Sequence, residues 1–585
     1  MNPETRTCQN CKQTFLIESD DFAFYERIKV PPPTWCPECR MIRRFSFRHE
    51  KGLYRVKDAA SGKEIFSGIS PQSGLKVYGH DYWWSDAWDA SEYAQDIDFS
   101  RPFLGQVREL MYKVPWPSRG IIDLVNSDYS DKASYLKNCY LCFNSGQIED
   151  SAYITSSWYI KNSFDITEGE KVELCYQCQE TGESYKTFFS LYCDQANGVW
   201  FSRDCTGCTD CFGCVNLRNK QYYIFNEQYS KEEYLAKLKE FDTGSYENFR
   251  RIFEMARKRW MSHPYKYSHG THNLNVSGDC LHNSKNAFFS YQIDDVENSK
   301  FLQNVNFNVR DSYDYTTWGE NAELMYEAIE TGLNCRNVRF SFDSWPAMQD
   351  SEYSIKCGSS SNLFGCVGLK KKSYCILNKQ YTPEEFYALR EKIMKHMEEM
   401  PYVDSKGRVY KYGEFFPLEF SPYSYYETIA QDYFPLTSEE AKEKGFKWIS
   451  PEVRNIPITK QVEELPDHIN HTDRSILNEV IACSSCNKPY RIIASELQFL
   501  KINTIPLPRI CWECRHHERL SWTNSPRYFS GNCSCSGSVN KAGNYTNQAE
   551  HSHGQAPCSN EFITTFAPDR KEIVYCEPCY QAEII

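Results

Sequence analysis

The most regular pattern in the chain lies between Ser127 and Cys375, where Asn or Asp followed by a small residue recurs at short intervals. In its clearest stretch the step is 12 residues, and the hydrophobic positions between show no helical 3.6-residue periodicity. A short fixed period indicates units that bury their apolar faces only by stacking on neighbouring units. The pairs are Asn126-Ser127, Asn138-Cys139, Asp150-Ser151, Asn162-Ser163, Asp204-Cys205, Asp210-Cys211, Asn286-Ala287, Asn298-Ser299 and Asp311-Ser312.

The residue types in this repeat favour short strands joined by tight corners. Asn and Asp tolerate a left-handed backbone and hydrogen-bond their own main chain, which suits corners. Ser and Cys are small enough to stack inward. We therefore predict a mostly β fold, a β-solenoid similar to a parallel β-helix, and one hypothesis places two of these units in each turn of the coil.

A longer repeat indicates that the β-solenoid is duplicated. Residues 172–182 resemble residues 322–332, and residues 212–215 resemble residues 364–367. The offset between the copies is 150 to 152 residues, so we predict a tandem duplication.

Helical insertions are predicted after each copy. Ser230 and Glu233 form a capping box ahead of an apolar stretch that Gly244 is expected to divide into two helices. Thr382 and Glu385 form the same box after the second copy.

Cysteine pairs predict small zinc modules at both ends of the chain. The chain holds 27 Cys, many of them in CxxC pairs, the spacing that places thiolates around a tetrahedral zinc ion. Two pairs separated by 24 residues occur near the N-terminus, and the same spacing returns later. The predicted ligands are Cys8, Cys11, Cys36 and Cys39 in the first module, and Cys483, Cys486, Cys511 and Cys514 in the second.

A third predicted site lies at the end of the chain. A CxxC pair follows a cysteine that stands ahead of an aromatic residue, as in the first two modules, but Gln555 occupies the expected position of the first cysteine. A nearby residue must then supply the fourth ligand. With this site we expect about three zinc ions per chain. The predicted ligands are His553, Cys558, Cys576 and Cys579, and the alternatives to His553 are His551, Cys535 and Cys533.

Basic and aromatic residues follow the second cysteine pair of the first two modules. Arginine grips phosphate with its planar fork, and aromatic rings between arginines suit base stacking. We therefore predict a contact with RNA or single-stranded nucleic acid; a solvated helix face is the alternative. The predicted contact residues are Arg40, Arg43, Arg44, Arg48, Arg515 and Arg519, with Phe45, Phe47 and Trp522 as stacking partners.

Four further cysteines lie inside the first copy at a spacing that iron–sulfur clusters also use. Two of them recur in the second copy as Cys357 and Cys366, whereas Ser360 and Leu363 replace the other two. Stacking inside the coil explains both copies, so we predict that this run holds no iron. The run is Cys205, Cys208, Cys211 and Cys214.

Charge and hydropathy limit the binding partners and the cellular compartment that we expect for the protein. The net charge of −12 over 585 residues argues against a protein that coats nucleic acid with its whole surface. The chain has no apolar leader and no run of 18 apolar residues, so we expect neither a signal peptide nor a membrane partner. Cysteines in CxxC pairs are typical of a reducing compartment, and we expect the cytoplasm.

These patterns divide the chain into seven segments. Three of these segments carry the cysteine pairs. We call them, in chain order, the first, second and third cysteine modules. The predicted segments are the first module 1–53, an aromatic cap 54–120, solenoid copy one with helices 121–262, copy two with its helix 263–397, an aromatic connector 398–475, the second module 476–530 and the third module 531–585.

The cysteine pairs, with an aromatic residue after the first pair and Pro before the second, resemble zinc-ribbon and treble-clef modules. The wider arrangement resembles an uncharacterised family of zinc-ribbon proteins from candidate-phylum bacteria of small genome. That resemblance rests on residues 364–369, 376–381 and 573–577. It covers most of the chain, and it implies an architecture but no activity.

Three functions from different classes fit the sequence. The favoured one is a non-enzymatic zinc-binding protein that contacts nucleic acid or a ribonucleoprotein through its zinc modules. The alternative is a protein–protein scaffold with structural zinc and a Tyr-rich solenoid face for the partner. The third is a carbohydrate-active solenoid enzyme, which is less favoured because no Asp, Arg or Lys cluster recurs in the repeat as a catalytic set.

Overall fold

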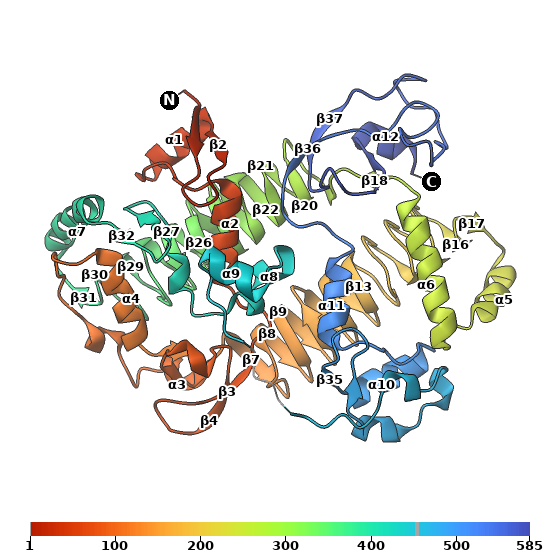
Figure 1. The fold of residues 1–585 in the computed structure, drawn as a ribbon, viewed down its shortest axis with the longest axis horizontal. Helices are drawn as coiled ribbons and strands as arrows, with labels where there is room; N and C mark the ends of the chain where they lie inside the picture. Colours follow the sequence, from red (N-terminus) through yellow and green to blue (C-terminus); the bar gives the residue numbers. More distant parts are fainter. Residues whose placement is uncertain (1, 451–454, 585) are drawn as a thin grey trace.

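The computed structural model describes residues 2–450 and 455–584. Strands cover 32% of the protein and helices 24%, so the prediction of a mostly β protein with helices is confirmed. Two long stacks of strands, parallel except for the last strand of each, occupy the centre of the molecule (Figure 1). We call them the first ladder (residues 121–228) and the second ladder (residues 270–380).

The strands of the first ladder are β7 (Ile121–Val125), β8 (Asp131–Lys137), β9 (Tyr140–Glu149), β10 (Ala152–Thr155), β11 (Trp158–Lys161), β12 (Phe164–Glu173), β13 (Tyr176–Gly182), β14 (Asn197–Trp200), β15 (Thr209–Phe212), β16 (Gln221–Ile224) and β17 (Glu227–Gln228). Those of the second ladder are β19 (Gly270–Thr271), β20 (Gly278–His282), β21 (Lys285–Phe288), β22 (Ser290–Lys300), β23 (Gln303–Arg310), β24 (Tyr313–Gly319), β25 (Ala322–Glu323), β26 (Tyr326–Ile329), β27 (Arg336–Phe342), β28 (Gln349–Glu352), β29 (Ser361–Phe364), β30 (Ser373–Ile376) and β31 (Lys379–Gln380).

The period of the sequence repeat equals the number of residues that separates two paired residues on neighbouring strands of a ladder. Ile154 pairs in parallel with Cys142 on one side and with Ile166 on the other, 12 residues away in each direction. Part of the second ladder uses an offset of 13, as in the pairing of Val296 with Val309. Each unit of 12 or 13 residues therefore pairs directly with the next unit. The hypothesis that two units make up one turn of the coil is wrong.

Left-handed residues recur at about every third position and form the corners between strands. Tyr135, Asn138 and Leu141 have φ angles of 56°, 55° and 52°. This conformation costs a residue with a side chain roughly 1–2 kcal/mol, so other contacts must offset it. Hydrogen bonds between stacked corner side chains offset part of this cost. Asn126 Nδ2 donates to Asn138 Oδ1 at 3.0 Å, and Asn138 Nδ2 donates to Asp150 Oδ1 at 2.9 Å.

Buried hydroxyls and thiols satisfy the backbone inside the ladders. Ser163 Oγ donates to the carbonyl of Lys161 at 2.8 Å and accepts from the N–H of Cys175 at 3.0 Å. The thiol of Cys175 does the same in the next unit, with the carbonyl of Glu173 at 3.3 Å and the N–H of Thr187 at 3.2 Å. Ser and Cys recur after the corner residue because each satisfies two backbone groups that would be costly to bury unpaired.

The run of four cysteines in the first ladder follows the same rule. Each of the four thiols donates to the carbonyl two residues before it, at 3.5 Å, and all four are buried. Their spacing of three puts them at successive inward positions of the ladder. The absence of iron stays a prediction. The four are Cys205, Cys208, Cys211 and Cys214.

Helices surround the ladders and join the modules to them. The two predicted helices before and after Gly244 and the helix after the second ladder are present, each predicted capping box included, so these predictions are confirmed. Among the described residues, none of the helices has the length and apolar character needed to cross a membrane. The helices are α1 (Ser19–Arg27), α2 (Pro37–Phe45), α3 (His80–Trp84), α4 (Phe103–Lys113), α5 (Lys231–Phe241), α6 (Tyr246–Met261), α7 (Pro383–Glu399), α8 (Ile429–Tyr433), α9 (Ser438–Lys444), α10 (Ala494–Ile502), α11 (Trp512–Leu520) and α12 (Glu577–Ala582).

Short strands outside the ladders form two-stranded sheets, most of them antiparallel. These strands are β1 (Glu4–Thr7), β2 (Thr14–Ile17), β3 (Tyr54–Lys57), β4 (Glu64–Ser67), β5 (Val77–Tyr78), β6 (Trp116–Pro117), β18 (Tyr265–Lys266), β32 (Tyr402–Val403), β33 (Val409–Tyr410), β34 (Ile481–Ala482), β35 (Pro489–Tyr490), β36 (Phe529–Asn532), β37 (Glu561–Thr564) and β38 (Val574–Tyr575).

The aromatic segment before the first ladder covers more than the coil it precedes. Phe66 lies 4.9 Å from Tyr129 at the start of the first ladder, measured between ring centroids. Phe103 of α4, however, packs 5.1 Å from Phe364 near the end of the second ladder. The segment predicted as an aromatic cap therefore contacts both ladders.

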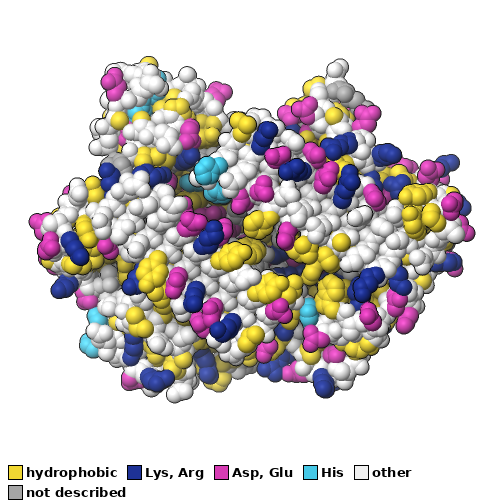
Figure 2. All heavy atoms as spheres, turned by 180° about the vertical axis from the view of Figure 1, so that it is seen from behind, with side chains coloured by type: hydrophobic (Ala, Val, Ile, Leu, Met, Phe, Trp, Pro, Cys, Tyr) yellow, Lys and Arg dark blue, Asp and Glu magenta, His cyan; other side chains and the backbone are white. Residues whose placement is uncertain are grey.

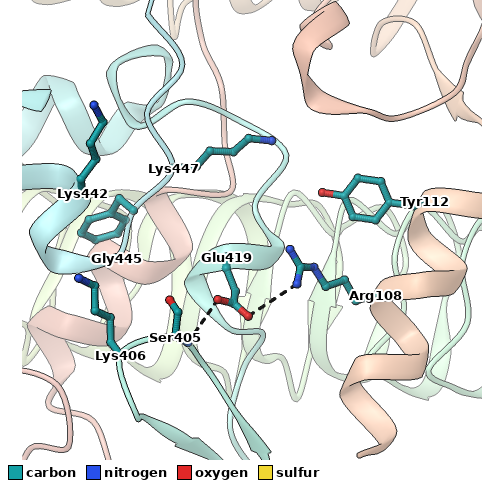
Figure 3. A pocket seen from close by; sticks show the side chains of 9 residues that line it. Arg108, Tyr112, Ser405, Lys406, Glu419, Lys442, Gly445 and Lys447 are labelled. Atoms are coloured by element: carbon teal, nitrogen blue, oxygen red, sulfur yellow. Dashed lines mark hydrogen bonds and ion pairs between the residues drawn. The ribbon is translucent and has the colours of Figure 1, made fainter.

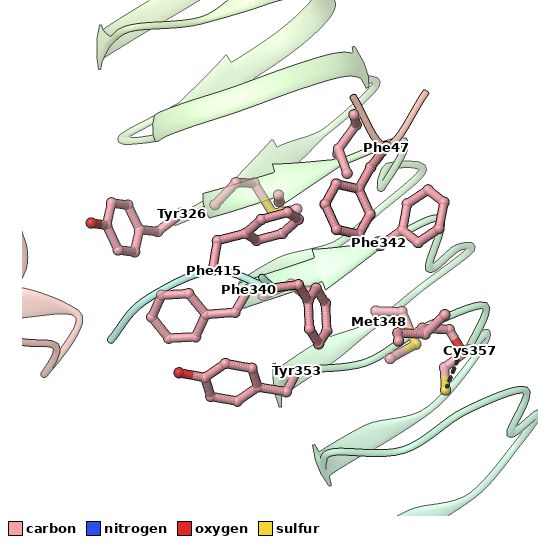
Figure 4. Packing of buried hydrophobic residues seen from close by; sticks show 14 of the residues in the cluster. Phe47, Tyr326, Phe340, Phe342, Met348, Tyr353, Cys357 and Phe415 are labelled. Atoms are coloured by element: carbon pink, nitrogen blue, oxygen red, sulfur yellow. Dashed lines mark hydrogen bonds between the residues drawn. The ribbon is translucent and has the colours of Figure 1, made fainter. Parts of the chain in front are cut away.

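Aromatic side chains from distant segments cover one face of the second ladder. Phe47 lies 5.5 Å from Phe342 and 5.2 Å from Phe415, and Phe340 stacks on Tyr353 at 4.8 Å (Figure 4). Phe415 belongs to the connector predicted at 398–475, of which residues 451–454 lie outside the described residues. The connector therefore contributes to the core of the second ladder.

Replacing Ser163 by alanine is expected to destabilise the protein by about 1–3 kcal/mol, because the buried N–H of Cys175 loses its acceptor. Urea denaturation of the full chain measures the loss. Ser163→Cys is the matched control, since a thiol fills this role at Cys175, and it should cost less. Equal losses in the two variants would contradict the role assigned to the hydroxyl.

Candidate metal centres

The structure brings together the two predicted four-cysteine sets. In each set the four sulfur atoms lie within 4.8 Å of one another. A tetrahedral zinc ion with Zn–S bonds of about 2.3 Å holds its sulfurs about 3.8 Å apart. The Cys11 and Cys36 sulfurs are 3.8 Å apart, and those of Cys486 and Cys511 are 3.7 Å apart. Both sets therefore fit a zinc ion without rearrangement.

Backbone N–H groups prepare these sulfurs for metal binding. The N–H of Cys36 donates to Cys8 Sγ at 3.2 Å, and the N–H of Cys511 donates to Cys483 Sγ at the same distance. Burial raises the pKa of the Cys483 thiol, but hydrogen bonds from neighbouring backbone N–H groups outweigh it and lower that pKa to about 7. Helices α2 and α11 begin directly after Cys36 and Cys511, and the positive end of a helix favours a nearby thiolate, although burial and the neighbouring Cys483 raise the pKa of the Cys511 thiol itself.

In the third module the structure corrects the predicted fourth ligand. Cys533 completes the group with Cys558, Cys576 and Cys579. The N–H of Cys576 donates to Cys533 Sγ at 3.3 Å, the contact that Cys36 makes with Cys8 in the first module. Cys533 therefore takes the position of the first cysteine, in place of the predicted His553.

An insertion explains why the spacing rule missed Cys533. Two residues separate Cys8 from Cys11, whereas residues 534–557 separate Cys533 from Cys558. The backbone closes in the same way in both modules: the N–H of Cys8 donates to the carbonyl of Gln13 at 2.8 Å, and the N–H of Cys533 to that of Asn560 at 3.0 Å. In the sequence, the third site could be recognised only from Cys558 and the residues that follow it.

His553 lies in a fourth group of potential ligands. Its partners there are Cys535, His551 and Cys579, with all four ligand atoms within 4.8 Å of one another. The two groups of the third module therefore share Cys579. The described residues thus form four groups that could hold metal ions, where the sequence predicted about three ions.

The six arginines predicted to contact nucleic acid are buried, which contradicts the exposure that such a contact requires. Each is at most 3% exposed and pairs with acidic residues. The predicted stacking residues Phe45, Phe47 and Trp522 are also buried. A helix with a basic face looks the same in sequence whether that face meets solvent or buried carboxylates. The six are Arg40, Arg43, Arg44, Arg48, Arg515 and Arg519.

Helix α2 of the first module docks on the second ladder through a buried carboxylate. Arg40 Nη2 lies 2.8 Å from Asp314 Oδ2, and Arg44 Nη1 lies 3.0 Å from Asp314 Oδ1. Arg44 Nε donates to Thr316 Oγ1 at 3.0 Å. Both acceptors belong to β24, so α2 lies across that ladder (Figure 1).

Helix α11 of the second module repeats these contacts on the first ladder. Arg515 Nε lies 2.8 Å and Arg519 Nη1 3.2 Å from the carboxylate of Asp165. Arg519 Nε donates to Thr167 Oγ1 at 3.3 Å. Asp165 and Thr167 belong to β12, so the two modules and the two ladders dock in a crossed arrangement, each module on the ladder farther along the chain from it.

The remaining two arginines extend the network around α2. Arg43 pairs with Glu327 of the second ladder at 2.5 Å and with Glu414 of the connector at 3.2 Å. Arg48 pairs with Glu50 and with Glu330, each at 2.5 Å. The arginines that follow the cysteine knuckles therefore hold parts of the protein together.

A basic pocket of about 460 Å³ lies between α4 and the connector (Figure 3). Four cationic side chains line it, and its one acid, Glu419, lies 3.7 Å from Arg108. The balance of charge suits an anion. Sequence reasoning missed this pocket because its residues come from distant segments. The basic residues are Arg108, Lys406, Lys442 and Lys447.

The four-cysteine groups are compatible with zinc-ribbon-like modules. No protein-family model matches the chain, and no curated protein matches it. The resemblance to a zinc-ribbon family therefore rests on the sequence segments alone.

Replacing Arg515 by methionine is expected to destabilise the protein by about 3–5 kcal/mol, because Glu496 stays buried without its arginine and Asp165 keeps only Arg519. Arg527→Met is the control, since the Arg527–Glu38 pair is nearly half exposed and should contribute at most about 1 kcal/mol. Denaturant midpoints of both variants measure this. Equal effects would contradict the docking role of Arg515.

Glu496 should make stability depend on pH. Burial raises its pKa to about 7, although Arg515 opposes the shift. A carboxyl whose folded pKa lies above its unfolded pKa contributes stability at low pH and loses it as pH rises through the folded pKa. The free energy of unfolding of wild type minus that of Glu496→Gln should fall between pH 5 and pH 8, by on the order of 1–3 kcal/mol. A difference that rises over this range would contradict the assignment.

Proposed function

We propose that this chain is a non-enzymatic scaffold, stabilised by structural zinc, that binds a protein partner on an exposed face of its first ladder. In this proposal the two ladders are the two copies of a duplicated β-solenoid. The 12-residue pairing offset, the left-handed corners and the inward Ser and Cys side chains support that architecture.

The burial of the six arginines carries this proposal. They were the residues that favoured nucleic acid, and each is instead engaged by a carboxylate of a ladder, the first module or the connector. A zinc ion with four cysteine ligands is closed and keeps no position for a substrate. In this proposal zinc therefore orders the modules, and the modules brace the ladders.

An exposed aromatic face supports the position of the partner. Tyr135 and Tyr159 are 50% and 53% exposed, and Val125 is 61% exposed. Tyr159 precedes Asp165 by half of a 12-residue unit. The face that carries Tyr159 therefore lies on the side of the first ladder opposite Asp165, where α11 packs. Seen from behind, hydrophobic side chains gather across the middle of the molecule among charged ones (Figure 2). Exposed aromatic residues of this kind are typical of protein interfaces.

Site-specific photo-crosslinking tests the proposal. A photoreactive amino acid at Tyr159 should capture one defined protein from nuclease-treated native lysate. The same amino acid at Tyr82, which is 37% exposed but lies in the cap, is the control and should not capture it. Tyr135→Ser should abolish the capture at Tyr159. Identical products at both positions, or no defined product at Tyr159, would contradict the scaffold function.

Binding of nucleic acid is the second candidate, and the basic pocket is the observation that favours it. Arg108, Lys406, Lys442 and Lys447 offer four cations to a phosphate backbone. If this candidate is right, labelled RNA binds at low salt and the triple variant Lys406→Ala, Lys442→Ala, Lys447→Ala weakens it. RNA binding that this variant leaves unchanged would remove the candidate.

A further inference from the structure

We propose that the third cysteine module holds a dinuclear zinc centre in which the Cys579 thiolate bridges the two ions. The inference is independent of the partner-binding function. It adds a fourth zinc ion to the protein and assigns a role to the insertion at residues 534–557.

The first ion has the geometry of the other modules. The sulfurs of Cys558 and Cys576 are 3.8 Å apart, the edge of a tetrahedral zinc site. Asn560 Nδ2 donates to Cys576 Sγ at 3.2 Å, a contact that stabilises a thiolate. Cys533 and Cys579 complete this four-sulfur group.

The second ion takes its ligands from the insertion and from Cys579. Cys535 Sγ lies 3.0 Å from His551 Nδ1, and His553 Nε2 lies 3.3 Å from Cys579 Sγ. In a tetrahedral site with zinc bonds of about 2.0 and 2.3 Å, nitrogen and sulfur ligands are about 3.5 Å apart. The side chains need to open by only a few tenths of an ångström. With Cys579 shared, seven residues give each ion four ligands.

Hydrogen bonds fix both imidazoles in the orientation that the second ion needs. His553 Nδ1 lies 2.7 Å from the carbonyl of Ala556, which only accepts, so that nitrogen carries the proton and Nε2 is free to bind a metal. His551 Nε2 lies 2.8 Å from Glu583 Oε1, which leaves Nδ1 directed at Cys535. A histidine ligand held by a carboxylate or carbonyl is the usual outer shell of a zinc site.

The residues that hold the ligands of the second ion in place are themselves hydrogen-bonded. Glu583 is 2% exposed and also accepts from Tyr545 Oη at 2.7 Å and from the N–H of Gln548 at 2.8 Å. Asn547 Nδ2 donates to Cys535 Sγ at 3.2 Å. These contacts orient the ligands of the second group independently of the four-cysteine group.

Burial and folding both favour a second ion. Cys535 and His551 are buried, with Cys535 Sγ 3.0 Å from His551 Nδ1, so two ligands are already brought together away from solvent. The insertion has little regular structure of its own, with the isolated bridges Cys535↔Asn540 and Val539↔Thr546. A metal that joins the insertion to α12 supplies the stability that so small a segment lacks.

Metal analysis of the intact purified protein tests the proposal. Wild type should contain four zinc ions per chain, whereas a mononuclear third module gives three. A double variant, His551→Asn with His553→Asn, should lose one ion and keep three, while the control His471→Asn, at an exposed position, should keep four. Three ions in wild type, or four in the double variant, would overturn the dinuclear centre.

Cadmium-113 NMR of cadmium-loaded protein tests the bridge itself. Two metal ions that share a thiolate split each other's signals, so two of four resonances should show mutual splitting. The double variant should show three unsplit resonances. If that variant does not fold, the wild-type spectrum still decides: four resonances without mutual splitting would rule out the shared Cys579.

Discussion

The structure depends on buried ion pairs between the cysteine modules and the ladders. Asp314 and Asp165 are fully buried, and a lone carboxylate in such a place would cost several kcal/mol. Arg40 with Arg44, and Arg515 with Arg519, neutralise them. Those arginines reach their partners because α2 and α11 begin at the cysteine knuckles, so module folding and ladder burial support one another, and a metal ion in the knuckles would strengthen both.

The same contacts occur twice, once on each ladder. The spacing of Arg40 and Arg44 matches that of Arg515 and Arg519, and in both units the second arginine also donates to a threonine two residues beyond the aspartate. The first module, which precedes both ladders, lies on the second ladder, and the second module, which follows both, lies on the first.

Short-range features could be predicted from the sequence, and long-range contacts could not. The 12-residue period predicts strand pairing because the hydrogen bonds of Ser163 join each unit to the next. The CxxC spacing brings ligands together within a knuckle. The direction of Arg44 was not predictable, since Thr316 lies 272 residues away. Cys533 remained only an alternative to His553, because residues 534–557 stand where the other modules have a two-residue knuckle spacing.

Hydrogen exchange of the full-length protein, before and after zinc removal by a chelator, tests the central claim most directly. If metal-ordered modules hold the buried arginines in place, zinc removal raises exchange in α2 and α11 and in β24 and β12 beneath them. Strands that these helices do not cover, such as β15, keep their protection. Unchanged exchange in α2 and α11 of protein shown by elemental analysis to be free of zinc would contradict the account.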